Sequence, residues 1–456
     1  MTGADLASLT PALLLAAGAA AATVLGSTIK ASARVLGWLG ALSCIGAAAI
    51  AIAIGPAVAD AGAAAPLGGT VVRDGASVFF VALIGVAAAA SLAVGAADPH
   101  RRSRSVRSGA PADEVALILF SAGGAVLVVS AADLVVLFVG LALLTVPLYA
   151  LTARWRTQGG DERVIRHFLL GATSSATALY GIALLYAATG ETGYLGLGRA
   201  THNPLYLGGL GLALAGLVFH TVLAPAQRSS IVVNIAIVGA LLRLVGVTQR
   251  GEVALDWEVS LAALAALALV SGLAALTERR LGWLIGYAAI SQLGYVLLAA
   301  AGSAFPAAAF AIAAAAALAV GLFGVLALVP RDEPTLDDLA GLARARPLVT
   351  LALGVLVGGL IGVPPTVGFL SKLYVFESAV RGQLLWLVVL GALASVIGAA
   401  SYARVALACF APRRLEAIAP SRARAGTALV VLAAIAVLLL GVLPGPLLDA
   451  AQAVRF

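Results

Sequence analysis

The sequence predicts an all-α integral membrane protein with about 14 transmembrane helices, and three observations support this fold class. Of its 456 residues, 62% are hydrophobic and only 11% are charged, whereas soluble domains carry about 25% charged residues. Apolar runs of about 18 to 25 residues, each long enough to span a bilayer as a helix, recur along the whole chain. Basic residues are concentrated in every second connecting segment. Soluble enzyme folds are therefore excluded.

The apolar runs follow one another with short connections. Their centres lie near residues 17, 44, 87, 121, 142, 176, 214, 239, 267, 291, 317, 354, 397 and 437. The twelfth run is followed by an apolar half-helix near 368–380, so this region predicts one broken span. Glycines between Gly209 and Gly216 lie inside a helix without a preceding strand, which predicts close helix packing rather than dinucleotide binding.

The charge pattern predicts the topology. Of the 28 Lys and Arg residues, 20 fall in loops after odd-numbered helices and 4 in loops after even-numbered helices. By the positive-inside rule the odd loops are cytoplasmic, so both termini lie outside. The opening residues carry Asp5 and no basic residue, which argues against a cleaved signal peptide. We expect the lipid bilayer around the helices and no nucleic-acid partner. Two distant cysteines, Cys44 and Cys409, cannot supply an iron–sulfur or zinc ligand set.

Lys372 is the strongest candidate for a functional group. Only Lys30 and Lys372 are lysine among the 28 basic residues, and only Lys372 stands in an apolar stretch. Arginine stays charged in proteins, whereas a buried lysine can release its proton. A lysine retained here fits a proton-exchanging group. A snorkelling or structurally paired amine fits the composition equally well.

A helix break precedes this lysine. Pro364 and Pro365 remove two backbone donors and free carbonyls of the preceding turn. Broken helices at membrane depth are tolerated where they are buried in protein or line a hydrated cavity, and transporters place ion sites there. The break, the nearby glycines and the lysine together favour a site over a simple kink.

Several segments carry a resemblance to a known family. Residues 360–374, LIGVPPTVGFLSKLY, resemble the "AGIPPTAGFxGKFY" signature of NADH-quinone oxidoreductase subunit N. Residues 336–347 resemble its "DDLAGLxRRxP" loop, and residues 133–150 are similar to "DLLxLFLGLELLSLPLYAL". Residues 166–175, 179–190 and 287–295 continue the resemblance. The matches run in order from about residue 130 to 405.

The resemblance implies a fold with two inverted five-helix repeats, each with a broken helix. It divides the chain into an N-terminal three-helix segment at 1–110, a first repeat at 111–250, a second repeat at 251–411 and a C-terminal helix at 412–456. It implies a bacterial plasma-membrane protein that assembles with the other membrane subunits of complex I. NADH, FMN, iron–sulfur clusters and quinone would bind in partner subunits, with no cofactor, metal or redox active site in this chain.

The family mechanism is a buried relay of Lys, Glu and His groups that conducts protons, and this chain departs from it. The family's glutamate falls on Ala142, and one family lysine falls on Asn234. His220 either replaces a second lysine or is the family's histidine, depending on the alignment. The resemblance therefore assigns the relay to Lys372, His220 and Asn234. A neutral buried His220, bonded to a carbonyl freed by Pro225, is the alternative role for that side chain.

Other polar residues near the helices have structural interpretations. Asp133 is expected to cap a helix, and Arg243 to form an ion pair or to snorkel. Glu377 could pair with Lys372 or lie at the outer interface. Three functions stay open: a proton-translocating subunit of complex I, a non-pumping structural subunit of it, or a subunit of a cation/proton antiporter or membrane-bound hydrogenase.

Overall fold

The computed structural model describes ten stretches of the chain, and within them the backbone is almost entirely helical. The described residues are 3–61, 67–97, 111–154, 160–198, 203–223, 230–248, 255–329, 331, 334–412 and 424–456. Each of the 14 predicted centres lies within a helix. In these stretches ten helices are long and apolar enough to cross a membrane, or eleven if one bent pair counts as a span. The all-helical membrane fold is thus confirmed.

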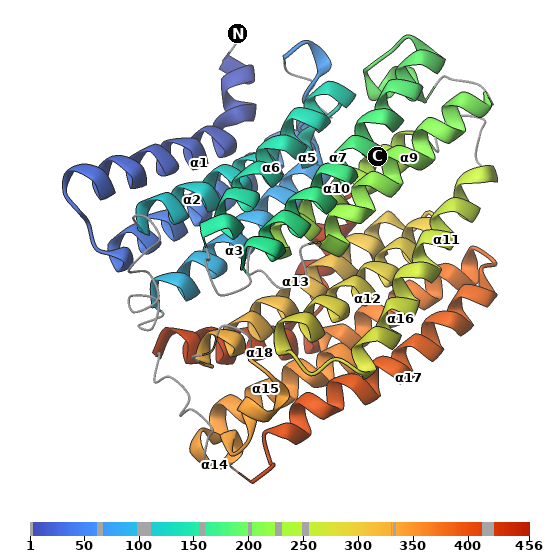
Figure 1. Cartoon of the computed structure of the whole chain (residues 1–456). Helices are drawn as coiled ribbons and strands as arrows, with labels where there is room; N and C mark the ends of the chain where they lie inside the picture. The colour runs from blue at the N-terminus through green and yellow to red at the C-terminus, as the bar shows by residue number, and fades with distance from the viewer. Residues whose placement is uncertain are drawn as a thin grey trace.

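The first part of the chain forms three long helices. Their bounds are α1 (Gly3–Thr28), α2 (Ala33–Ala61) and α3 (Gly75–Ala97), with a 3₁₀ turn η1 (Leu67–Gly69) before α3. Helix α2 packs along α3, and α1 packs against α5 (Figure 1).

The next group of helices packs beside them. It consists of α5 (Pro111–Ser130), α6 (Leu134–Arg154), α7 (Gly160–Thr189), the short α8 (Tyr194–Leu197), α9 (Pro204–Leu223) and α10 (Ser230–Thr248). Among the helices that the structure describes, α7 and α9 make the most extensive pairing. A Cβ at Gly216 of α9 would collide with the backbone of Ala178 on α7. A Cβ at Gly209 would likewise collide with the backbone of Leu185, whereas Gly211 faces open space, so the predicted close packing is confirmed at Gly209 and Gly216 but not at Gly211.

The following group contains the broken span. It consists of α11 (Leu255–Val270), the 3₁₀ helix η3 (Ser271–Leu276), α12 (Leu281–Ala301), α13 (Phe305–Leu328), η4 (Leu336–Leu339), α14 (Leu342–Ala345), α15 (Pro347–Ile361), α16 (Val367–Arg381) and α17 (Leu385–Ala408). The predicted half-helix near 368–380 is α16.

The segment predicted as a single C-terminal helix contains two. Helix α18 (Arg424–Val442) packs against α13 and α15, and α19 (Gly445–Gln452) turns away from it by 78°. The two large groups of helices meet where α10 packs on α12 and α13, in the middle of the molecule (Figure 1). The last residue, Phe456, returns to this junction and packs on Gly246 of α10.

Connecting segments gather at two ends of the helices. At one end, isolated bridges join Val71 to Ala131 and Asp133 to Gly193. The C-terminal segment lies at the same end, because a Cβ at Gly75 would collide with the backbone of Ala453. A further bridge, between Arg280 and Thr335, joins the segments after η3 and after α13.

Candidate functional site

The broken span creates a set of free carbonyls. Helix α15 ends at Ile361, and Gly362 follows in the left-handed region with φ 91°. The backbone N–H groups of Gly362 and Val363 both return to Gly358 O, at 2.8 Å. Because prolines 364 and 365 carry no N–H, the carbonyls of the last turn of α15 need other donors.

Lys372 supplies those donors. It lies in the second turn of α16, and only 7% of it is exposed. Its Nζ donates to Leu360 O at 3.0 Å and to Ile361 O at 2.9 Å. A third bond runs to Ser395 Oγ at 2.7 Å, from α17. The ammonium thus lies at the negative end of the α15 dipole, which stabilises its positive charge.

Aromatic side chains close the site on the side of α12. Lys372 Nζ lies 5.2 Å from the ring centroid of Tyr295, close enough for a cation–π interaction. The Tyr295 hydroxyl donates to Gly391 O at 3.0 Å, and its ring meets that of Phe376 edge-on. Glu377 pairs instead with Arg381 at 2.6 Å. Of the two alternatives for Glu377, the structure shows an exposed side chain and no pair with Lys372.

Close approach of α15 and α16 shapes the break. A Cβ at Gly368 would collide with the carbonyl of Gly359, so only glycine permits this contact. The five residues between the two helices bring the first two turns of α16 alongside the last turn of α15. This packing is what lets Lys372 reach carbonyls 11 and 12 residues earlier in the chain.

Asn234 lies at a small cavity next to this site. The cavity, of ≈ 30 Å³, is lined by residues of α10, α12 and α13, including Asn234 and Gln292, and by Leu360 of α15. Asn234 Oδ1 is buried without a hydrogen-bond partner. Apart from Asn234 and Gln292, the lining of the cavity is apolar. A cavity above about 10–15 Å³ has room for a water molecule, and the orphaned amide oxygen offers that water a hydrogen-bond acceptor. Since Leu360 O binds Lys372, the cavity adjoins the lysine site.

His220 forms a separate cluster with two serines of α7. Its Nδ1 lies 2.7 Å from Ser174 Oγ and 2.9 Å from Gly216 O, and its Nε2 lies 3.1 Å from Ser175 Oγ. Ser174 Oγ itself donates to Gly216 O at 2.7 Å. Because a carbonyl oxygen can only accept, the short distance to Gly216 O favours the tautomer that carries the hydrogen on Nδ1, and in that tautomer Nε2 accepts from Ser175. Pro225, the third predicted break, lies outside the described residues.

The remaining polar candidates are structural, as expected. Asp133 Oδ1 accepts from the backbone N–H of Val135 at 2.7 Å, capping α6, and its Oδ2 accepts from Thr192. Arg243 forms an ion pair with Asp74 at 2.7 Å.

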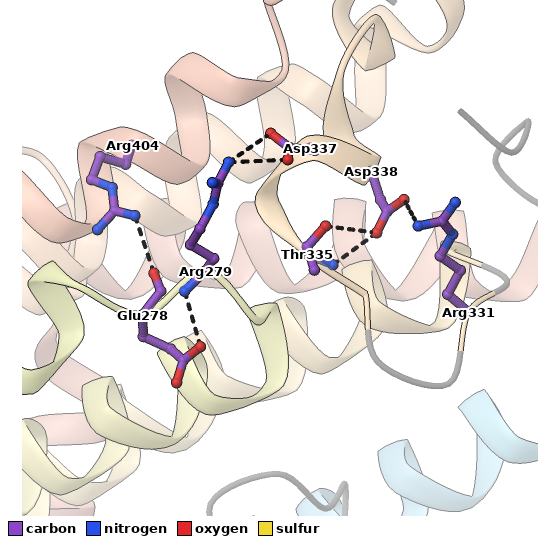
Figure 2. A network of polar contacts seen from close by, with 7 residues as sticks. All are labelled: Glu278, Arg279, Arg331, Thr335, Asp337, Asp338 and Arg404. Atoms are coloured by element: carbon purple, nitrogen blue, oxygen red, sulfur yellow. Dashed lines mark hydrogen bonds and ion pairs between the residues drawn. The ribbon is translucent and has the colours of Figure 1, made fainter. Parts of the chain in front are cut away.

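A polar network joins the loops at the other end of the helices. Figure 2 shows Arg279 pointing at Asp337, at 3.0 Å, and Asp338 held between Arg331 and Thr335. Arg404 of α17 donates to the carbonyl of Glu278 at 3.1 Å and also to that of Leu276. These contacts tie the segment after η3 to the segment after α13 and to helix α17. Within the described residues, no group of three or more His, Cys, Asp or Glu side chains could hold a metal ion.

The structure thus brings Lys372 and Asn234 to one region and leaves His220 in another. The contacts of Ser395 with Lys372 and of Ser174 and Ser175 with His220 were not predicted from the sequence. The two adjacent serines lie in the segment 166–175 that resembles the family, whereas a single serine in the apolar run of α17 carries no signal of its own.

Comparison with known proteins decides the family. The family model described as NADH:quinone oxidoreductase/Mrp antiporter matches residues 131–398. NADH-quinone oxidoreductase subunit N of Geobacter metallireducens is 33% identical, over 100% of both chains. Subunit N of Salinibacter ruber is 34% identical, over 73% of this chain and 74% of its own. The chain belongs to the NADH-quinone oxidoreductase subunit N family.

Solved structures agree with this family membership. A chain of respiratory complex I from Thermus thermophilus is 30% identical, with a TM-score of 0.81 over 97% of this chain and 99% of its own. A chain of an Mrp complex from a Dietzia species is 19% identical, with a TM-score of 0.82 over 98% and 96%. At that identity the second likeness shows the fold alone. The break, Lys372, His220 and Asn234 all fall inside the segment matched by the family model.

Proposed function

We propose that this chain is an antiporter-like membrane subunit of respiratory complex I and that it conducts protons through Lys372. The relatives named subunit N and the complex I chain of similar structure support the first part. The second part depends on one observation: a buried ammonium held by the freed carbonyls of a broken helix. In this role the chain is part of an oxidoreductase, while NADH, FMN, iron–sulfur clusters and quinone are bound by partner subunits.

The relay would pass through two regions. Lys372 is the group that gains and loses a proton, the cavity at Asn234 supplies water next to it, and His220 with its two serines conducts in the other repeat. The side chain of Asn234 cannot itself carry the charge, so it acts by holding water.

The proposed arrangement in the plasma membrane has 14 spans and two inverted repeats at 111–250 and 251–411. Beyond the ten long helices, α10, α11 with η3, the pair α15–α16, and α18 with α19 would supply four more. The topology draws support from the loops. The segments near Val71, Asp133 and Gly193 meet at one end with the C-terminal segment, as expected for even loops and an outside C-terminus. The Arg-rich segments after η3 and α13 meet near Arg279 and Arg331 (Figure 2).

A purified complex containing the variant chain, reconstituted in vesicles, tests this function. Lys372→Ala should lower the number of protons moved per NADH oxidised while the complex still assembles and oxidises NADH. Lys372→Arg keeps the charge but cannot release it, so it should resemble Lys372→Ala. An unchanged proton ratio in both variants would reject proton conduction through Lys372.

The second candidate is a structural subunit that does not pump. The neutral Asn234 and Ala142, where the family has Lys and Glu, favour it. For that function, assembly would depend on the chain and the proton ratio would be the same in Lys372→Ala as in the wild type.

A further inference from the structure

The contacts of Lys372 differ in what they can do with a proton. Two of the groups that bind Nζ are backbone carbonyls, which accept hydrogen bonds but do not take up and pass on a proton. Tyr295 presents its ring face, and its hydroxyl donates to Gly391 O. Among the contacts of Nζ with described residues, Ser395 alone provides an exchangeable proton directly at the nitrogen, at 2.7 Å.

We propose that Ser395 is the proton-exchange partner of Lys372. This inference rests on the proposed conduction through Lys372 and names the group through which the proton leaves or enters. In the outward step an Nζ–H bond breaks and a new O–H bond forms at Ser395 Oγ. The original hydroxyl proton of Ser395 passes at the same time to a water molecule. The lysine becomes neutral, the serine is regenerated, and the positive charge moves to the water.

The position of Ser395 suits both states of the lysine. Its Oγ lies 2.7 Å from Nζ and 3.4 Å from Ile361 O. When the lysine is charged, Ser395 accepts from Nζ and rests with its own hydrogen directed at Ile361 O, and it turns that hydrogen to the water molecule before the proton is passed on. When the lysine is neutral, the same hydroxyl can rotate and donate to the nitrogen lone pair. One rotation of a hydroxyl therefore serves both protonation states without movement of α15, α16 or α17.

Buried hydroxyl groups continue from Ser395 between α12 and α17. The side chain of Tyr295 interacts with Ser395, and that of Tyr402 with Ser291. The residues Tyr295, Tyr402 and Ser291 are each at most 4% exposed. These hydroxyl groups offer hydrogen-bond partners to water. Tyr402 lies two residues before Arg404 on α17, and Arg404 donates to the carbonyl of Glu278 (Figure 2).

The test compares variants of the whole complex in vesicles by the number of protons moved per NADH oxidised. Ser395→Ala should lower this ratio to the value found for Lys372→Ala. Ser401→Ala is the matched control, because Ser401 is a buried serine of the same helix that bonds Ile397 O. It should keep the wild-type ratio. Assembly is checked for each variant by the amount of complex recovered.

A second pair separates the hydroxyl from the shape of the side chain. Ser395→Thr and Ser395→Val place side chains of similar shape, but only threonine keeps the hydroxyl. The Lys372-dependent part of the proton ratio is the difference between the wild type and Lys372→Ala. We expect Ser395→Thr to keep at least half of that difference and Ser395→Val to lose it. A wild-type ratio in Ser395→Ala, or equal ratios in Thr and Val, would overturn the inference. If Lys372→Ala also keeps the wild-type ratio, conduction through Lys372 itself fails; if it lowers the ratio, only the role of Ser395 fails.

Discussion

The guanidinium of Arg243 binds both carboxylate oxygens of Asp74, at 2.7 and 2.8 Å, across 169 positions of sequence. Arg243 belongs to α10 and Asp74 precedes α3, and the arginine side chain is only 4% exposed. Its Nε also donates to Val129 O of α5, and the ring of Phe456 lies over it. This pair joins the start of α3, helices α5 and α10, and the C-terminal residue Phe456.

Loss of one partner of this pair should destabilise the chain strongly. Arg243→Leu leaves a carboxylate without its partner, and breaking a buried ion pair costs about 3–5 kcal/mol. We expect a lower Tm and less assembled complex. Arg279→Leu, which breaks an exposed pair with Asp337, is the control and should cost only about 0–1 kcal/mol. Equal thermal stability of the two variants would contradict this prediction.

The same pair should make stability depend on acid pH. Burial by itself raises the pKa of Asp74, but the hydrogen bond and charge of Arg243 outweigh it and hold that pKa below its usual value. A lowered folded-state pKa stabilises the fold above the unfolded pKa of about 3.9, and the stabilisation is lost as pH falls through the folded pKa. The Tm difference between the wild type and Asp74→Asn should therefore be largest near neutral pH and shrink below about pH 4. A difference that stays constant from neutral to acid pH would argue against it.

Removal of the hydroxyl group of Ser175 should affect the proton ratio more than removal of that of Ser174. Ser175→Ala removes the donor to Nε2, the nitrogen that is free to accept a proton in this tautomer. Ser174→Ala leaves Nδ1 bonded to Gly216 O. We expect the proton ratio to fall more in Ser175→Ala than in Ser174→Ala. Thr177→Ala, an exposed change on the same helix, should have no effect. If His220 is purely structural, all three variants will pump alike and differ only in stability.

The cavity at Asn234 should be required to hold water on the proposed proton path. Asn234→Leu fills it with apolar atoms and removes the orphaned oxygen, so water is excluded. We expect a lower proton ratio with normal assembly. Ile235→Leu, a change of equal volume in the same lining, is the control. An unaltered ratio in Asn234→Leu would show that protons do not pass this cavity.

The contact between α15 and α16 should not tolerate a methyl group. Gly368→Ala places a Cβ against the carbonyl of Gly359, and overpacking of this kind costs typically about 1–3 kcal/mol. We expect a lower Tm and a proton ratio reduced like that of Lys372→Ala. Gly354→Ala on α15 has no atom within 4 Å of the new Cβ and should be neutral. Comparable behaviour of both variants would mean that the break can relax around the methyl group.

The helices and the lysine could be predicted because their signals are local. The centres of all 14 apolar runs lie within helices, ten of which are long and apolar enough to cross a membrane, and the proline pair marks the break between α15 and α16. The structural roles of Asp133 and Arg243 also followed from their residue types, although Asp74 as the partner did not. The role of Ser395 could not be predicted. Its partner Lys372 lies 23 positions earlier in the chain, and no local feature of the sequence distinguishes Ser395 from Ser401 on the same helix.

The sequence by itself determined where the chain is helical and which segments carry the family pattern, and it singled out Lys372 and His220 as candidates for proton exchange. An apolar run in lipid must satisfy its backbone hydrogen bonds within its own segment, so its composition decides its conformation. The tertiary structure alone decided which groups meet: Lys372 with Ser395, His220 with Ser174 and Ser175, and Arg243 with Asp74. These partners come from different helices, and their pairing depends on close packing between helix surfaces rather than on any spacing along the chain.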